Sequence, residues 1–164
     1  EMYTRSGKQF MRLRNWKEAD RMFAAALQVA EELGPEDPRL GVALNNAAHV
    51  HQARRRYAEA EALYRRALDI AIRVHGRDHP DAAVNLANLA GLYQARELYD
   101  QAEPLYREAL ETFEKTMGDH HPGTARLLGG YASLLRRMAR DEEAARVENR
   151  ARQIGPRDAG AGTA

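Results

Sequence analysis

A short motif, an Asp or His followed by Pro, recurs in this chain at intervals of 42 residues. It occurs at Asp37-Pro38, His79-Pro80 and His121-Pro122. When the segments that follow are aligned, the same residue types return, namely Leu44, Leu86 and Leu128, then Ala48, Ala90 and Ala132, and then Ala67, Ala109 and Ala151. Self-similarity at such a period is the signature of a stacked array, whose core is built between neighbouring repeats.

Each repeat is predicted to contain two antiparallel helices. In the second repeat, apolar residues within 40–53 follow the i, i+3, i+4, i+7 spacing of one helical face. Residues 54–56 form a turn, and a second helix is expected from Tyr57 to about Val74. Gly76 can take the positive φ that ends a helix. Because no segment alternates as strands do, the sequence predicts an all-α fold.

The domain organisation follows from the repeat. We expect one repeat domain over residues 1–154 and a flexible Gly- and Ala-rich tail over residues 155–164. The repeats are predicted at about residues 1–36, 37–78, 79–120 and 121–154.

The last repeat departs from the others. It has Glu148 where Tyr64 and Tyr106 stand, and Arg152 where Leu68 and Leu110 stand. These substitutions predict a solvent-facing outer side that ends the array. The amino end shows no equivalent change, which predicts an uncapped apolar surface there for a further repeat or for self-association.

Histidines near the turns raise the question of a metal site, at His75, His79, His120 and His121. His79 and His121 occupy the place that Asp37 takes one repeat earlier, at the start of a helix. A side chain that caps the helix explains this pattern better than a metal ligand does, and no spacing matches a zinc motif. The sequence therefore predicts no metal and no cofactor.

Composition and missing motifs exclude several function classes. The formal net charge of +1 disfavours nucleic acid as the partner. No apolar stretch approaches the ~20 residues of a membrane span, so no membrane partner is expected. The absence of cysteine fits the cytoplasm and excludes disulfides. No phosphate loop or nucleophile motif is present, so we expect no enzyme.

The third repeat carries the clearest family signal. The segment Leu86-Ala-Asn-Leu-Ala-Gly-Leu-Tyr93, followed by Tyr99-Asp-Gln-Ala-Glu-Pro-Leu-Tyr-Arg-Glu-Ala-Leu110, resembles the tetratricopeptide repeat (TPR). The 42-residue period and the His-Pro junction are most similar to the kinesin-light-chain type of this repeat. The resemblance covers about residues 3–154. It implies a right-handed α-solenoid of about four antiparallel helix-turn-helix units.

The resemblance also implies a binding surface, a concave groove lined by the first helix of each repeat. In the kinesin-light-chain type, a Leu-x-Asn pattern places an Asn in the groove, and Asn46 and Asn88 match it. Gly130 and Arg5 stand at the corresponding positions of the other repeats, so the series is incomplete. The candidate groove residues are Arg5, Lys8, Arg12, Asn45, Asn46, His49, Gln52, Asn88, Gln94, Arg126, Ser133, Arg136 and Arg137.

These features favour a protein–protein interaction scaffold that binds a peptide or protein segment in the groove. The basic residues of the first and last repeats suggest an acidic ligand, because Arg binds carboxylates through charge-assisted hydrogen bonds. Two alternatives remain open. One is a self-association module that forms a homo-oligomer through the uncapped amino end or the groove. The other is a sensor fragment of a larger bacterial signalling protein.

Overall fold

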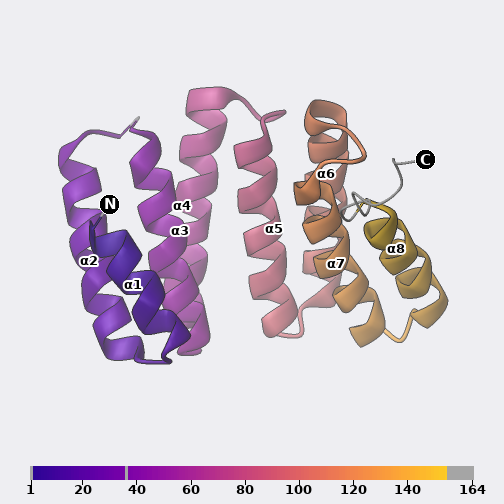
Figure 1. Ribbon diagram of the computed structural model, residues 1–164, viewed down its shortest axis with the longest axis horizontal. Coiled ribbons are helices and arrows are strands. Elements are labelled where there is room, and N and C mark those ends of the chain that lie inside the picture. Colours follow the sequence, from indigo (N-terminus) through magenta and orange to yellow (C-terminus); the bar gives the residue numbers. More distant parts are fainter. Residues whose placement is uncertain (1, 36, 155–164) are drawn as a thin grey trace, which may run out of the picture. The chain divides into compact units, whose positions relative to one another are not determined.

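The computed structural model describes residues 2–35 and 37–154 of the 164-residue chain. The described residues form eight α-helices and no strand, which confirms the predicted all-α fold (Figure 1). The predicted tail, residues 155–164, lies outside the described residues. The helices are α1 (Met2–Arg12), α2 (Trp16–Glu32), α3 (Pro38–Ala53), α4 (Tyr57–His75), α5 (Pro80–Ala95), α6 (Tyr99–Met117), α7 (Pro122–Arg137) and α8 (Asp141–Ile154).

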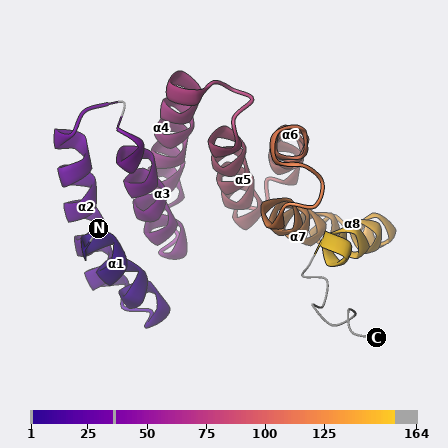
Figure 2. The same ribbon diagram turned by 45° about the horizontal axis from the view of Figure 1, so that its top comes forward.

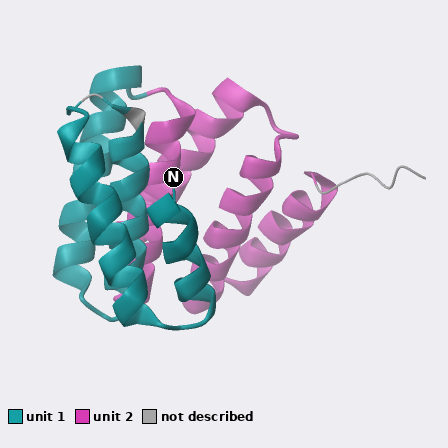
Figure 3. Ribbon diagram, turned by 60° about the vertical axis from the view of Figure 1, so that its left-hand side comes forward, with its two compact units in different colours: residues 1–77 teal, residues 78–164 magenta. Residues whose placement is uncertain are grey.

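The chain divides into two compact units, residues 1–77 and residues 78–164, which Figure 3 colours separately. In the first unit α1 packs on α2 and α3 on α4, and contacts between α2 and α3 join the two pairs. In the second unit α5 packs on α6 and α7 on α8, and α6 contacts α7 (Figure 2). Each unit is therefore a pair of antiparallel helical hairpins.

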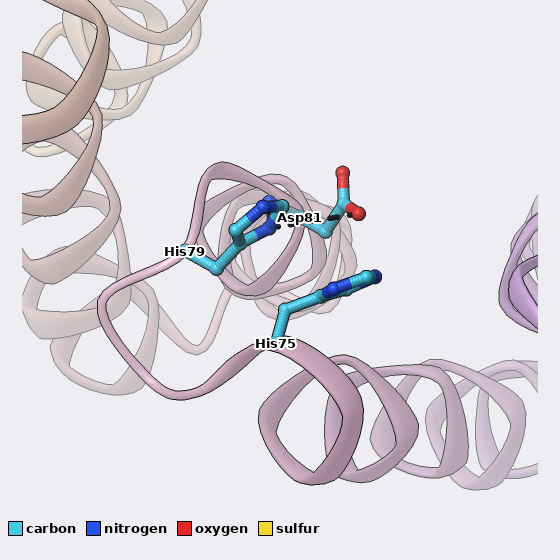
Figure 4. A group of neighbouring side chains, drawn as sticks. All are labelled: His75, His79 and Asp81. Carbon is cyan, nitrogen blue, oxygen red and sulfur yellow. Dashed lines mark hydrogen bonds and ion pairs between the residues drawn. The ribbon is translucent and has the colours of Figure 1, made fainter. Parts of the chain in front are cut away.

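The Asp/His-Pro motif starts the first helix of three hairpins. The side chains of Asp37, His79 and His121 accept hydrogen bonds from the backbone N–H two residues later, at 2.9, 3.2 and 3.0 Å. These bonds satisfy N–H groups that the first helical turn leaves without partners. Figure 4 shows His79 beside Asp81, at the start of α5, and His75, the last residue of α4. The predicted capping role of the junction residues is confirmed.

The turn inside each hairpin has one non-glycine residue in the left-handed region. The four residues have φ values between 55° and 62° and are Arg14, Arg55, Glu97 and Ala139. A left-handed residue other than glycine costs roughly 1–2 kcal/mol. In each turn the next N–H binds the carbonyl five residues back, at 2.8 to 2.9 Å. These bonds offset the cost and give all four hairpins the same closure.

Small residues mark the closest helix contacts. Ala48, Ala90 and Ala132 are almost fully buried. At Gly7, a methyl group added to the backbone would lie 2.7 Å from the ring of Phe23, which is itself fully buried. A larger side chain at these points would therefore push the packed helices apart.

Ion pairs join the two hairpins within each unit. In the first unit, Asp20 of α2 binds Arg54 at 2.6 Å and Arg56 at 2.8 Å, both in the turn of the next hairpin. In the second unit, Glu103 of α6 binds Arg140 of the corresponding turn at 2.8 Å. Burial would raise the pKa of Glu103, but hydrogen bonds from Arg140 and Tyr131 outweigh it and lower that pKa.

Replacing Ala90 with Leu tests the predicted packing register. Because Ala90 is fully buried, we expect overpacking to lower the free energy of unfolding by roughly 1–3 kcal/mol. Ala95→Leu, at an exposed position of the same helix, is the control and should change it by less than about 0.5 kcal/mol. Urea unfolding followed by circular dichroism measures both, and equal effects would contradict the register.

Two Gly→Ala substitutions should have opposite signs. Gly7→Ala places its methyl group against the Phe23 ring, and we expect a loss of roughly 1–3 kcal/mol in unfolding free energy. Gly129→Ala, inside α7 with no heavy atom within 4 Å of the added methyl group, should gain roughly 0.5–1 kcal/mol through helix propensity. The same unfolding measurement applies, and a shared sign would show that the contact at Gly7 is not close.

Candidate functional site

In the first unit, two predicted groove residues share one tyrosine. The hydroxyl of Tyr64, on α4, lies 2.7 Å from Nδ1 of His49 and donates to Oε1 of Gln52 at 3.0 Å. The His49 ring meets the Tyr64 ring edge to face, with centroids 5.4 Å apart. The structure thus brings together His49 and Gln52, two of the residues predicted from the sequence.

The proton positions on His49 depend on its tautomer, and the two contacts of the Tyr64 hydroxyl favour one of them. A hydroxyl has one proton, so if Tyr64 donates it to Gln52, then Nδ1–H of His49 must donate to the Tyr64 oxygen. In the neutral ring, Nε2 is then left as a hydrogen-bond acceptor. Although the side chain is exposed, partial desolvation of the ring lowers the pKa of His49. The surface therefore presents a neutral acceptor here at pH 7.

The second unit repeats the same hydrogen bond. Tyr106, on α6, donates to Oε1 of Gln94 at 3.3 Å, and Nε2 of Gln94 donates to Oγ of Ser133 at 3.0 Å. Gln94 lies on α5 and Ser133 on α7, so this bond links the first helices of the two hairpins. Gln94 and Ser133 are the second pair of predicted residues that the structure brings together.

At the equivalent positions of the last hairpin, an ion pair replaces the Gln–Tyr bond. Nε of Arg136 binds one oxygen of Glu148 at 2.7 Å, and its Nη2 binds the other at 2.8 Å. Asp141 lies 3.6 Å from the same guanidinium. The side chain of Glu148 is 31% exposed, so it meets solvent as expected, but the sequence did not reveal that Arg136 also binds it. The Arg136 charge is correspondingly compensated within the hairpin.

The other predicted cations differ from Arg136. They are exposed, and among the described residues none of them has a hydrogen-bond or ion-pair partner; they are Arg5, Lys8 and Arg12 on α1 and Arg126 and Arg137 on α7. Their guanidinium and ammonium groups are open to carboxylates of another molecule.

The predicted asparagines are half-buried. Asn45 and Asn46 lie on α3 and Asn88 on α5. Nδ2 of Asn46 is buried and, within the described part of the chain, has no hydrogen-bond partner. An unsatisfied buried donor costs roughly 1–3 kcal/mol.

Tyr64 and Tyr106 also contribute to the candidate site, although the sequence did not single them out. Both are buried, yet each uses its hydroxyl to orient a glutamine on the first helix of its hairpin. The signal available in the sequence was the constant separation of 12 residues between Gln52 and Tyr64 and between Gln94 and Tyr106.

Among the described residues, no helix is both long and apolar enough to span a bilayer.

Comparison with solved structures identifies similar folds. A crystal structure of BtubC (BKLC) from P. vanneervenii matches with a TM-score of 0.78 and 21% sequence identity, over 99% of this chain and 67% of that one. Two crystal structures from Podosopora anserina, provisionally described as a kinesin light chain with nearly identical TPR-like repeats, match at 20% identity over 93% of this chain and 72% of theirs. Their TM-scores are 0.74 for a point variant and 0.71 for the other form. No curated protein sequence matches the chain.

The family profile extends over nearly the whole chain. The Tetratricopeptide repeat profile matches residues 1–71, 39–97 and 82–156. These repeats typically form non-enzymatic scaffolds that mediate protein–protein interaction. Together with the all-α hairpins, the match confirms the predicted α-solenoid fold, and the solved structures show that this fold is similar to that of kinesin-light-chain-like repeat proteins. This chain belongs to the tetratricopeptide repeat family.

Proposed function

We propose that this protein is a non-catalytic scaffold that recognises an acidic peptide or protein segment on the first helices of its repeats. A cytoplasmic setting is part of the proposal, in keeping with a chain that holds no cysteine. The proposed contact residues are Arg5, Lys8, Arg12, Asn45, Asn46, His49, Gln52, Asn88, Gln94, Arg126, Ser133, Arg136 and Arg137.

The observation that carries the proposal is a separation of charge between first and second helices. The first helices (α1, α3, α5 and α7) contain seven Lys or Arg residues and one acidic residue, Asp81. The second helices (α2, α4, α6 and α8) contain ten Lys or Arg residues and sixteen acidic ones. The net charge of +1 conceals this pattern. Cationic first helices on an almost neutral protein attract acidic segments and repel basic ones.

The ion pairs strengthen this difference in charge between the first and second helices. On the second helices most cations have acidic partners, for example Arg65 with Glu61 and Arg107 with Glu103. On the first helices, acidic partners bind Arg39 and Arg136. Within residues 2–35 and 37–154, the other five cations of these helices have no acidic partner, so their charge is available to a ligand.

The amides support recognition of an extended backbone. A primary amide offers both a donor and an acceptor, which matches the N–H and C=O of a peptide. Asn46 on α3 and Asn88 on α5 occupy the same repeat position, and both side chains are half-buried. The acceptor Nε2 of His49 lies on the same helix as Asn46. The proposed surface thus combines charge selectivity with contacts that do not depend on the ligand sequence.

An array of random peptides tests the charge preference. Peptides retained by the wild-type protein should be enriched in Asp and Glu, and retention should weaken as added salt shortens the screening length from about 30 Å to about 8 Å. The variant Lys8→Glu/Arg12→Glu should reduce binding of those peptides about tenfold. Lys17→Glu, an exposed reversal on α2, is the matched control. Retention without acidic enrichment would refute the acidic preference.

The amides are tested separately with Asn46→Ala/Asn88→Ala. Loss of two hydrogen bonds should weaken binding of the retained peptides about tenfold, whatever their side chains. The salt dependence should remain that of the wild type, because no charge is removed. Asn149→Ala, at an exposed position of α8, should have no effect. Unchanged dissociation constants, measured by fluorescence anisotropy, would remove both amides from the site.

A further inference from the structure

One histidine of the first unit lies at a repeat position that is apolar or aromatic in the other hairpins. His51, on α3, aligns with Phe10, Tyr93 and Leu135. The hairpin turn fixes this alignment, because the backbone carbonyl of each of these four residues accepts the N–H that closes its turn. Tyr93 and Leu135 are buried, and the side chain of His51 is 19% exposed. An ionisable side chain at a packing position departs from the repeat pattern, and such departures concentrate at functional sites.

His51 lies beside the ion pairs that join the two hairpins of this unit. Its Nε2 is 3.9 Å from Oδ1 of Asp20, on α2. The other oxygen of the same carboxylate binds Arg54 at 2.6 Å and Arg56 at 2.8 Å. Nδ1 of His51 is buried and, among the described residues, has no hydrogen-bond partner. One carboxylate therefore serves two guanidinium groups and lies close to an imidazole.

The neutral form of the ring suits these surroundings better than the charged form. A protonated imidazole carries N–H groups at both nitrogens, so its buried Nδ1–H would lose its hydrogen bond to water without gaining one within the described chain. Burial of the ring, followed by repulsion from Arg56 and Arg54, lowers the pKa of His51. The negative charges of Asp20 and of Glu59, on α4, act in the opposite direction and do not outweigh these effects.

The second unit has the corresponding junction without a histidine. There Glu103 binds Arg140, the residue equivalent to Arg56, at 2.8 Å. A second carboxylate, that of Glu143, binds the same guanidinium at 2.7 Å. Leu135 stands where His51 stands in the first unit, and a leucine side chain cannot take up a proton. The second unit is thus an internal control for the effect of the imidazole.

We propose that His51 is a proton-sensitive element of the junction between the two hairpins of the first unit. While the imidazole is neutral, Asp20 holds both arginines. When the ring takes up a proton in mild acid, a third positive charge enters the cluster, and the contact of α2 with the turn at residues 54–56 weakens. The first unit then opens more readily, whereas the junction at Glu103 keeps its strength. This element needs no ligand, so it stands apart from the proposed function.

The direction of the pH dependence follows from proton linkage. Folding lowers the pKa of His51, so the unfolded chain binds more protons as the pH falls below about 6.5, and stability is lost. Asp and Glu side chains stay mostly charged between pH 7.5 and 5.5, so histidines dominate this interval. His49 also has a lowered pKa and adds a loss of its own. Only the difference between the wild type and a His51 variant therefore measures the effect of His51.

The test compares the wild type with His51→Leu, which introduces the residue found at this position in the last hairpin. Urea unfolding at pH 7.5 and at pH 5.5 is followed by the fluorescence of Trp16, the single tryptophan, at the start of α2. The unfolding midpoint of the wild type should fall on acidification, and that of His51→Leu should fall less. His120→Leu replaces an exposed histidine and is the matched control, which should retain the full wild-type loss.

Hydrogen exchange locates the effect in the wild-type protein, without any variant. After correction for intrinsic exchange rates, acidification should reduce protection in α2 and at residues 51–56. Protection in α6 and at residues 135–140 should be retained. Equal losses of protection in the two units, or an unchanged pH dependence in His51→Leu, would overturn the proposal. So would an NMR titration of the His51 ring with its midpoint at or above about pH 6.5.

Discussion

In each hairpin, a residue on the first helix contacts the residue 12 positions later on the second helix. This contact holds the two helices together, and the candidate binding surface depends on it. Polar contacts of two kinds form at this pair in three hairpins: hydrogen bonds join Gln52 to Tyr64 and Gln94 to Tyr106, and a bidentate ion pair joins Arg136 to Glu148. In the first hairpin the equivalent residues are Met11 and Phe23, and Met11 packs against the apolar cluster that holds Phe23. Because the backbone turn is the same in all four hairpins, the pair can change its chemistry while the helices keep their spacing. Side chains at this pair are therefore engaged in the fold before any ligand arrives.

The fold was largely predictable because its signals are local and repeated. The Asp/His-Pro junction, the small residues such as Ala90 and the glycine after α4 each recur at a fixed interval, so every repeat supports the interpretation of the others. The Arg136–Glu148 pair was missed for a physical reason. Seen alone, Glu148 at an apolar position indicates exposure, and only the facing helix reveals the guanidinium that compensates it. The pair of Asp20 with Arg56 was hidden similarly, since charged residues on helix surfaces look alike in sequence until the neighbouring turn is known.

The candidate site was predictable as a set of positions and not as a set of contacts. The family pattern indicates which helix faces carry His49, Gln52, Gln94 and Ser133. The hydrogen bonds of His49, Gln52 and Gln94, however, are made with the buried residues Tyr64 and Tyr106. The distribution of charge was also not evident from the composition. A net charge of +1 suggests no preference between partners. Sorting the residues by helix type shows that the basic ones dominate the first helices and the acidic ones the second. Binding by such a protein depends on which helices carry the charges, and the net charge does not reveal this distribution.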